Sequence, residues 1–427
     1  MFTAAFASLT KMNFNKLLSG NITKYQKEGF IMISVGIDVS KGKSTVCIMK
    51  PCGEILESPF DIGHTADELD SLISLIKSFD EETRVVMEDT GHYHLPVATY
   101  LSSHNIFVCC VNALRMKKFC SQSIRRAKTD KIDSIKIASF GITYWNELVK
   151  AYPSNVIYDE LKFLARQYYQ VTGMLVKSKV NFSNLLDQVM PKINDVLSNQ
   201  GENHKLTEFV SRYIHFQNIL DMGEMKFTSD YCKWAKKKGY RLNERKAAEI
   251  LALAQNGIPT LPNSQSVKIA VSEAVKLIHS IEESRNTILA QMQDLCNTLP
   301  EYSVVKEMDC IGDTLAPRII AEIGDVRRFK NKHSLIAYAG IDAPPYQSGA
   351  FHASERHISK RGNSYLRKTG YEIMQSLIKH KPADNAVYNF IQKKRSEGKC
   401  GKEAMIAGLN KFLRVYYGKV MEFYSEH

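Results

Sequence analysis

Four carboxylates stand where metal-dependent chemistry on phosphate esters would need them. Asp38 lies inside an otherwise apolar strand pattern, and Glu88 ends another such pattern. Asp130 and Asp133 are three residues apart, a spacing that places both on one face of a helix. A charged carboxylate in an apolar strand is costly to bury unless a cation or hydrogen bonds compensate it. We therefore expect these acids to act together, although Asp130 after Thr129 also suits a simple helix-capping role.

The donor atoms indicate which ion such a site would take. Phosphoryl transfer can use two divalent ions about 3.5–4 Å apart, which hold the attacking and the leaving oxygen. Sites made of carboxylate oxygens suit Mg²⁺ or Mn²⁺. We expect Asp38, Glu88, Asp130 and Asp133 to be catalytic residues and the ligands of Mg²⁺ or Mn²⁺.

A second candidate for chemistry is Ser348. It lies between Pro344-Pro345 and Gly349, so the sequence predicts a loop there rather than a helix. A serine becomes a nucleophile when a neighbouring group takes its proton or stabilises the developing charge. The residues alone equally fit a turn serine that hydrogen-bonds within its own loop.

Basic residues accompany both candidates. We expect two clusters to contact nucleic-acid phosphates, one near the acids and one near the serine. The first comprises Lys117, Lys118, Arg125, Arg126 and Lys128, and the second Arg356, Lys360 and Arg361. The net charge of +12 over 427 residues points the same way, because an excess of cations favours a polyanionic partner.

Alternating strands and helices would position the four acids. Hydrophobic periodicity predicts strands at 33–39, 44–49, 54–59, 84–87 and 106–111, and helices at 66–79, 95–103 and 130–144. Three antiparallel strands followed by crossover units give a mixed sheet with helices on its faces. That order is the α/β ribonuclease-H-like arrangement, in which the first and fourth strands are neighbours.

The remainder of the chain is predicted to be helical. We divide it into an N-terminal extension at 1–31, an acidic catalytic domain at 32–145, a helical middle at 146–300 with an insertion near 200–265, and a mainly α C-terminal domain at 301–427. Two long periodic stretches in the middle fit an antiparallel coiled-coil arm or an ordinary bundle equally well. Within the insertion, the basic run around Trp234 fits either base stacking beside phosphate contacts or a solvated helix face.

Composition narrows the cellular setting. The nine cysteines form no Cys-x-x-Cys pair, so we expect a reducing cytoplasm and no structural zinc. No apolar run is long enough to cross a bilayer, and residues 1–31 lack the pattern of a signal peptide, so no membrane partner is expected.

The short motifs together resemble the DEDD-type insertion-sequence transposases, whose N-terminal domain is RuvC-like, similar to Holliday-junction resolvases. The resemblance covers about 32–195 and 300–390. It is carried by Gly36-Ile37-Asp38-Val39-Ser40-Lys41, Glu88-Asp89-Thr90-Gly91, Lys128-Thr129-Asp130 with Asp133, Ala337-Tyr338-Ala339-Gly340-Ile341, Gln347-Ser348-Gly349, and Lys360-Arg361-Gly362-Asn363 with Leu366-Arg367. It implies a recombinase of mobile elements that combines the acidic site with the serine, Ser348 here, and is guided by a structured RNA. The chain departs from the family at Asp309-Cys310-Ile311-Gly312, where a Pro-Gly-Ile-Gly hairpin is usual, and its insertion is longer than usual.

The leading hypothesis is thus a DNA transposase that cleaves and rejoins strands with metal ions and a serine nucleophile. Its partners would be the DNA of the element ends and target, a guide RNA and further copies of itself, as a dimer or tetramer. The main alternative is a structure-selective nuclease of the same fold that uses activated water and does not need Ser348. A sugar-kinase-like or actin-like ATPase would need a second glycine-rich phosphate loop, which the sequence lacks. A non-catalytic nucleic-acid binder would not need Asp38.

Overall fold

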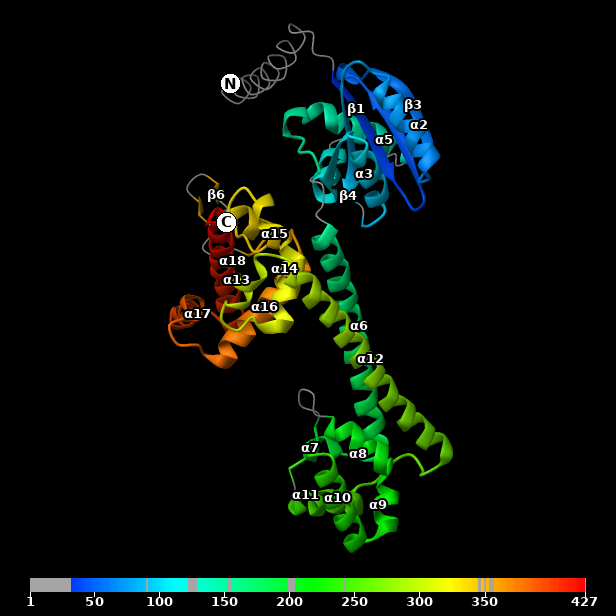
Figure 1. The fold of residues 1–427 in the computed structure, drawn as a ribbon, viewed down its shortest axis with the longest axis vertical. Helices are drawn as coiled ribbons and strands as arrows, with labels where there is room; N and C mark the ends of the chain where they lie inside the picture. The colour runs from blue at the N-terminus through cyan, green and yellow to red at the C-terminus, as the bar shows by residue number, and fades with distance from the viewer. Residues whose placement is uncertain are drawn as a thin grey trace, which may run out of the picture. The chain divides into compact units, whose positions relative to one another are not determined.

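A computed structural model of the chain describes residues 32–89, 91–121, 129–151, 156–198, 204–241, 243–344, 347–348, 351–352 and 357–426. The chain divides into two compact units, Met1–Ser154 and Asn155–His427 (Figure 1). The predicted extension at 1–31 lies outside the described residues, and the four-part domain division stays a prediction. Among the described helices, none has an apolar stretch long enough to span a membrane.

A five-stranded mixed sheet organises the N-terminal unit. The strands are β1 (Met32–Val39), β2 (Lys43–Met49), β3 (Ile55–Gly63), β4 (Glu82–Asp89) and β5 (Phe107–Asn112). Their order is β3-β2-β1-β4-β5, with β1 antiparallel to β2 and parallel to β4, and with β4 parallel to β5. The ribonuclease-H-like arrangement expected from the sequence is confirmed.

Helices cover both faces of this sheet. They are α2 (Ala66–Lys77), α3 (His94–Ser103), α4 (Ala113–Cys120) and α5 (Asp130–Thr143), with short 3₁₀ turns at Pro51–Gly53 and Trp145–Glu147. Alternate strand residues such as Val35 and Ile37 pack with α2 and α3, whereas Val86 and Cys109 pack with α4 and α5. This alternation follows from the two-residue period of a strand. Helix α4 was missed by the sequence analysis.

Two long helices form an arm in the second unit. Helices α6 (Val156–Val189) and α12 (Gln265–Asn297) pack against each other. The intervening residues form a helical head with its own hydrophobic core: α7 (Ile193–Val196), α8 (Lys205–Tyr213), α9 (Phe216–Met222), α10 (Glu224–Lys237) and α11 (Glu244–Asn256). Trp234 of α10 is 7% exposed and belongs to that core, so the stacking role considered for it is wrong.

The C-terminal part is mainly α, as expected. It comprises α13 (Tyr302–Lys306), α14 (Gly312–Ile323), a 3₁₀ turn at Val326–Arg328, α15 (Lys332–Ala339), α16 (Ser364–His380), α17 (Ala386–Ser396) and α18 (Gly401–Glu426), with the two short strands β6 (Gln347–Ser348) and β7 (Phe351–His352). Its core is continuous with the near ends of the arm helices, through Leu161 and Ala165 of α6 and Met292 and Cys296 of α12.

Candidate catalytic centre and nucleic-acid interface

Helix α5 lies directly on the sheet because glycine stands at the crossing. A Cβ atom on Gly36 of β1 would lie 2.2 Å from the backbone nitrogen of Ala138 and 2.4 Å from the carbonyl oxygen of Ser134. Farther along the helix, a Cβ on Gly141 would meet the Ser34 side chain at 2.1 Å. The helix therefore runs opposite to β1, and its N-terminal turn lies toward the carboxyl ends of β1 and β4.

This packing brings the four acids to one end of the sheet. Register pairs Ile37 of β1 with Met87 of β4, so Asp38 and Glu88 follow side by side. Gly36 and Val86 face α5. Asp38 and Glu88 each follow one of them by two residues, so the two acids lie on the same face of the sheet. Asp130 and Asp133 lie in the first turn of α5, toward the same end.

The Cys120 thiol, at the end of α4, lies close enough to sense most of these charges. Burial raises its pKa, Lys136 lowers it, and the carboxylates of Asp133, Glu88 and Asp38 raise it further. The charges of these three acids therefore all reach one thiol. Asp130 lies at the exposed start of α5.

The four carboxylates lie toward the same end of the sheet but do not converge on one metal position. Lys136 Nζ lies 3.3 Å from Asp133 Oδ1. Within the described part of the chain, the four carboxylates do not bring three ligand oxygens within 4.8 Å of one another. Asp38 and Glu88 are partly buried, and their oxygens are donors of the kind that hard divalent ions prefer. The donor chemistry therefore fits Mg²⁺ or Mn²⁺, with Lys136 as the local counter-charge that an ion would displace.

The predicted basic residues near the acids are only partly described. Lys117 and Lys118 lie exposed in the last turn of α4. Arg125, Arg126 and Lys128 lie outside the described residues.

In the second unit, backbone hydrogen bonds join the motif at 337–341 to the motif at 360–363, and we call this contact the clasp. The backbone nitrogen of Lys360 donates to the Gly340 oxygen at 2.9 Å, and that of Asn363 donates to the Tyr338 oxygen at 2.7 Å. A Cβ on Gly362 would lie 2.3 Å from the Tyr338 oxygen, so only glycine permits this approach. The clasp closes the base of the segment that carries Ser348.

A buried carboxylate anchors the clasp to the arm. Glu322 of α14 is 1% exposed, and it accepts hydrogen bonds from the Arg166 guanidinium of α6 and from Asn363 Nδ2, the latter at 2.7 Å. Asn363 also caps α16 through its side-chain oxygen. Asn363, which belongs to one of the motifs that carry the family resemblance, therefore has a structural role.

Ser348 is the last residue of β6 and pairs with Phe351 of β7, so it occupies a short hairpin rather than a helix. Its side chain lies outside the described part of the structure, and so does Arg356. Lys360 and Arg361 are exposed at the clasp.

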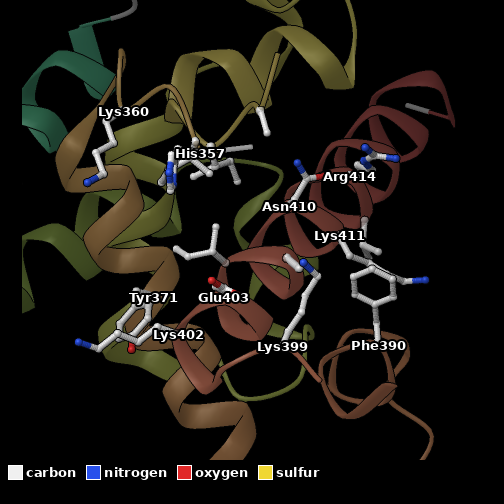
Figure 2. A pocket seen from close by; sticks show the side chains of 16 residues that line it. His357, Lys360, Tyr371, Phe390, Lys399, Lys402, Glu403, Asn410, Lys411 and Arg414 are labelled. Carbon is white, nitrogen blue, oxygen red and sulfur yellow. The ribbon is translucent and has the colours of Figure 1, made fainter. Parts of the chain in front are cut away.

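Next to the clasp is a cationic groove of about 1220 Å³ (Figure 2). Its lining combines His357 and Lys360 with side chains from three helices. These include Tyr371 of α16, Phe390 of α17, and Lys402, Lys411 and Arg414 of α18, which also contributes Glu403, while Lys399 lies just before α18. Cations with interspersed aromatic rings suit a nucleic-acid strand. The residues of α17 and α18 were not predicted from the sequence, although Lys411 and Arg414 have the three-residue spacing of one helix face.

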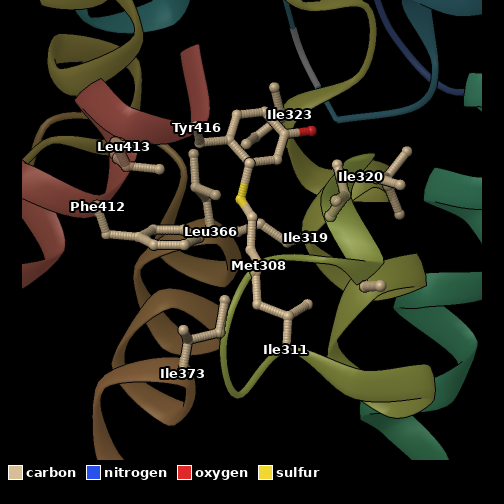
Figure 3. Close-up of a cluster of buried hydrophobic side chains, with 14 of the residues drawn as sticks. Met308, Ile311, Ile319, Ile320, Ile323, Leu366, Ile373, Phe412, Leu413 and Tyr416 are labelled. Atoms are coloured by element: carbon tan, nitrogen blue, oxygen red, sulfur yellow. The ribbon is translucent and has the colours of Figure 1, made fainter. Parts of the chain in front are cut away.

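Helix α18 lines the groove with one face and packs into the hydrophobic core with another. Phe412, Leu413 and Tyr416 of α18 point into the hydrophobic core with Ile319 and Leu366 (Figure 3). Lys411, just before Phe412, and Arg414, just after Leu413, line the groove instead. Amphipathicity of α18 thus holds the cations on a fixed surface.

Comparison with known proteins identifies two matching segments. Residues 35–191 match a DEDD model of IS110 described as a transposase, and residues 302–389 match the transposase IS116/IS110/IS902 family. The chain is 22% identical over 378 residues to the insertion element IS116 uncharacterized 44.8 kDa protein of Streptomyces clavuligerus, covering 88% of this chain and 91% of that protein. It is 21% identical over 299 residues to the insertion element IS110 uncharacterized 43.6 kDa protein of Streptomyces coelicolor, covering 70% and 72%.

Two more distant likenesses were found. A pilin gene-inverting protein of Moraxella bovis is 26% identical over 136 residues, covering 31% of this chain and 42% of that protein. The structure of T. thermophilus RuvC in complex with Holliday junction substrate matches with 10% identity and a TM-score of 0.21, covering 27% of this chain and 96% of that one. The first family match contains the four acids, and the second contains Ser348. The chain belongs to the IS110 family of insertion-sequence transposases, enzymes that recombine DNA.

Proposed function

We propose that this transposase cleaves and rejoins DNA with a divalent-ion site in its N-terminal unit and Ser348 as the nucleophile. The observation that carries the first half is the placement of Asp38 beside Glu88 on the sheet face that α5 covers, with Asp133 nearby. The inversion of a DNA segment, named for the Moraxella relative, is consistent with cutting and rejoining.

The acids would hold Mg²⁺ or Mn²⁺. Asp38, Glu88 and Asp133 would be ligands, and Asp130 would approach from the first turn of α5. When bound, such ions supply charge stabilisation at phosphate oxygens. The chain's own contribution is to orient these carboxylates by the close contact of α5 with Gly36, while Lys136 neutralises Asp133 until an ion takes its place.

The serine step would form one bond and break one. The Ser348 oxygen would lose its proton and attack a DNA phosphorus, forming a phosphoserine ester, while the bond to one sugar oxygen breaks and that oxygen takes up a proton. Attack by a second DNA hydroxyl would reverse the exchange, release the serine and join the strand. Lys360 and Arg361, exposed at the base of this segment, would stabilise the phosphate charge.

A suicide DNA substrate tests the serine. We expect a covalent protein–DNA adduct with the wild type, none with Ser348→Ala, and none with Asp38→Asn. An adduct that persists in Ser348→Ala would assign the nucleophile elsewhere. Cleavage without any adduct would favour the metal-dependent nuclease that uses activated water.

RNA guidance and self-association are separate parts of the proposal. Both cationic surfaces, at Lys117 and Lys118 and in the groove, suit a structured RNA as well as DNA. Sequencing the RNA that copurifies from cells carrying the element should give one discrete species encoded beside the gene.

The long arm helices suit pairing of copies in a dimer or tetramer. Light scattering of the purified protein would measure this oligomeric state. The buffer would be reducing, as expected for a cytoplasmic protein.

A further inference from the structure

Three metal-ligating side chains meet where the helical head joins the arm. His279 and Glu282 lie three residues apart on α12, and His204 is the residue before α8. One ligand atom from each of the three lies within 4.8 Å of the other two. Among the described residues this is the single group of three or more His, Cys, Asp or Glu side chains with that spacing.

Polar atoms in this group lack the hydrogen bonds that burial requires. Glu282 is 9% exposed, and its Oε2 lies 3.4 Å from His204 Nδ1. Neither atom has a hydrogen-bond partner within the described part of the chain. Buried polar atoms left this way cost free energy, and a bound ion is one of the ordinary explanations.

The two histidines are placed so that both can ligate one ion. Their ring centroids are 4.9 Å apart with an interplanar angle of 70°, so they do not stack face to face. One ring nitrogen of each lies within 4.8 Å of a carboxylate oxygen of Glu282. Imidazole nitrogen is a common ligand of zinc.

We propose that His204, His279 and Glu282 bind one Zn²⁺ ion, with water at the fourth position. Two nitrogens and one carboxylate oxygen match the ligand preference of zinc, and bonds of about 2.0–2.1 Å would require the ligand atoms to approach to roughly 3.3 Å by side-chain rotation. The group borders a polar cavity of about 860 Å³, which leaves room for the water. The bound ion would tie α8 of the head to α12 of the arm across 74 intervening residues, 205–278.

The sequence predicted no structural zinc, but that prediction relied on the absence of cysteine pairs, which bears only on sulfur-rich zinc sites. A site made from His-x-x-Glu on one helix and a histidine from elsewhere has no such sequence signal, because only folding brings residues 204 and 279 together. The proposal does not depend on the DNA chemistry.

Lys179 provides a sharp test because it competes with the ion. Its Nζ lies 2.7 Å from Glu282 Oε1 and already neutralises that carboxylate. A Zn²⁺ ion bound to Oε2 would be repelled by this ammonium group. Lys179→Met should therefore bind Zn²⁺ about tenfold more tightly than the wild type, whereas loss of an ordinary surface lysine should change nothing.

Zinc affinity is measured on the full-length chain after chelator treatment, by competition with a chromophoric chelator. We expect one tight equivalent in the wild type, at least about 100-fold weaker binding in His279→Ala and Glu282→Gln, and no change in the matched control His380→Ala on α16. Asp38→Asn should keep the tight equivalent, which separates this site from the acidic centre.

X-ray absorption of the wild-type zinc complex does not depend on any variant folding. It should show nitrogen and oxygen ligands with imidazole scattering and no sulfur. Sulfur ligation, wild-type affinity in both His279→Ala and Glu282→Gln, or weaker binding in Lys179→Met would each overturn the proposal.

Discussion

Gly36→Ala should separate the acids from one another while leaving both units folded. The added methyl group would point from β1 into the backbone of α5, at 2.2 Å from the Ala138 nitrogen and 2.4 Å from the Ser134 oxygen. Because these are backbone atoms, no side-chain rotation can relieve the contact. The helix must move away from the strand, and Asp130 and Asp133 move with it.

The size of the effect follows from these distances. Ordinary contacts of a Cβ begin at 3.4 Å, so the helix must shift by about 1 Å. Overpacking of this kind typically costs about 1–3 kcal/mol, partly offset by roughly 0.5 kcal/mol from the lower entropy of the unfolded chain. We expect the melting temperature to fall by about 5 °C. A displacement of about 1 Å at a catalytic group can reduce the rate about 100-fold.

The assay compares metal-dependent cleavage of an element-end DNA with thermal unfolding of the same samples. Gly173→Ala is the matched control, since Gly173 lies in α6 and a Cβ there would meet nothing within 4 Å. It should gain about 0.5–1 kcal/mol in stability and cleave normally. The double variant with Ala138→Gly should show the same reduction in cleavage as Gly36→Ala, because the contact with the backbone of residue 138 persists. Wild-type cleavage by a folded Gly36→Ala protein would refute the role given to α5.

Three further outcomes are expected. Lys402→Ala with Arg414→Ala should weaken nucleic-acid binding and lower the log–log salt slope by roughly 1.4–1.8, which a salt titration of binding would measure; an unchanged slope would remove the groove from the interface. Trp234→Phe should cost about 1 kcal/mol in thermal unfolding with unaltered nucleic-acid affinity, because the ring is buried; a selective loss of affinity would contradict this. The hydrogen bonds from Arg212 lower the pKa of Asp230. The stability that the Arg212–Asp230 pair contributes is therefore present above the unfolded pKa of Asp230, about 3.9, and is lost as the pH falls through the lower folded pKa. Asp230→Asn should flatten this loss of stability at acidic pH, and a stability–pH curve identical to that of the wild type would argue against a stabilising pair.

The sequence by itself determined the local structure and predicted the chemistry that we propose for the acids. Periodicity located all five strands of the first sheet and both arm helices, because the alternation of apolar residues is a local property. The order of strands then implied that Asp38 and Glu88 are neighbours, which the parallel pairing of β1 with β4 bears out. Helix α4 was missed, since eight residues carry too little periodic signal.

Tertiary structure alone decided what depends on contacts between distant residues. The packing of α5 on Gly36, the burial of Trp234, and the clasp between Gly340 and Lys360 depend on which surfaces meet, and no local pattern encodes that. The groove assembles cations from the clasp, from the segment before α18 and from α18 itself, and the zinc candidate joins His204 to His279 across the head. Hydrophobic burial drives such encounters without regard to sequence distance, so the polar groups carried along with the core meet only in the folded chain.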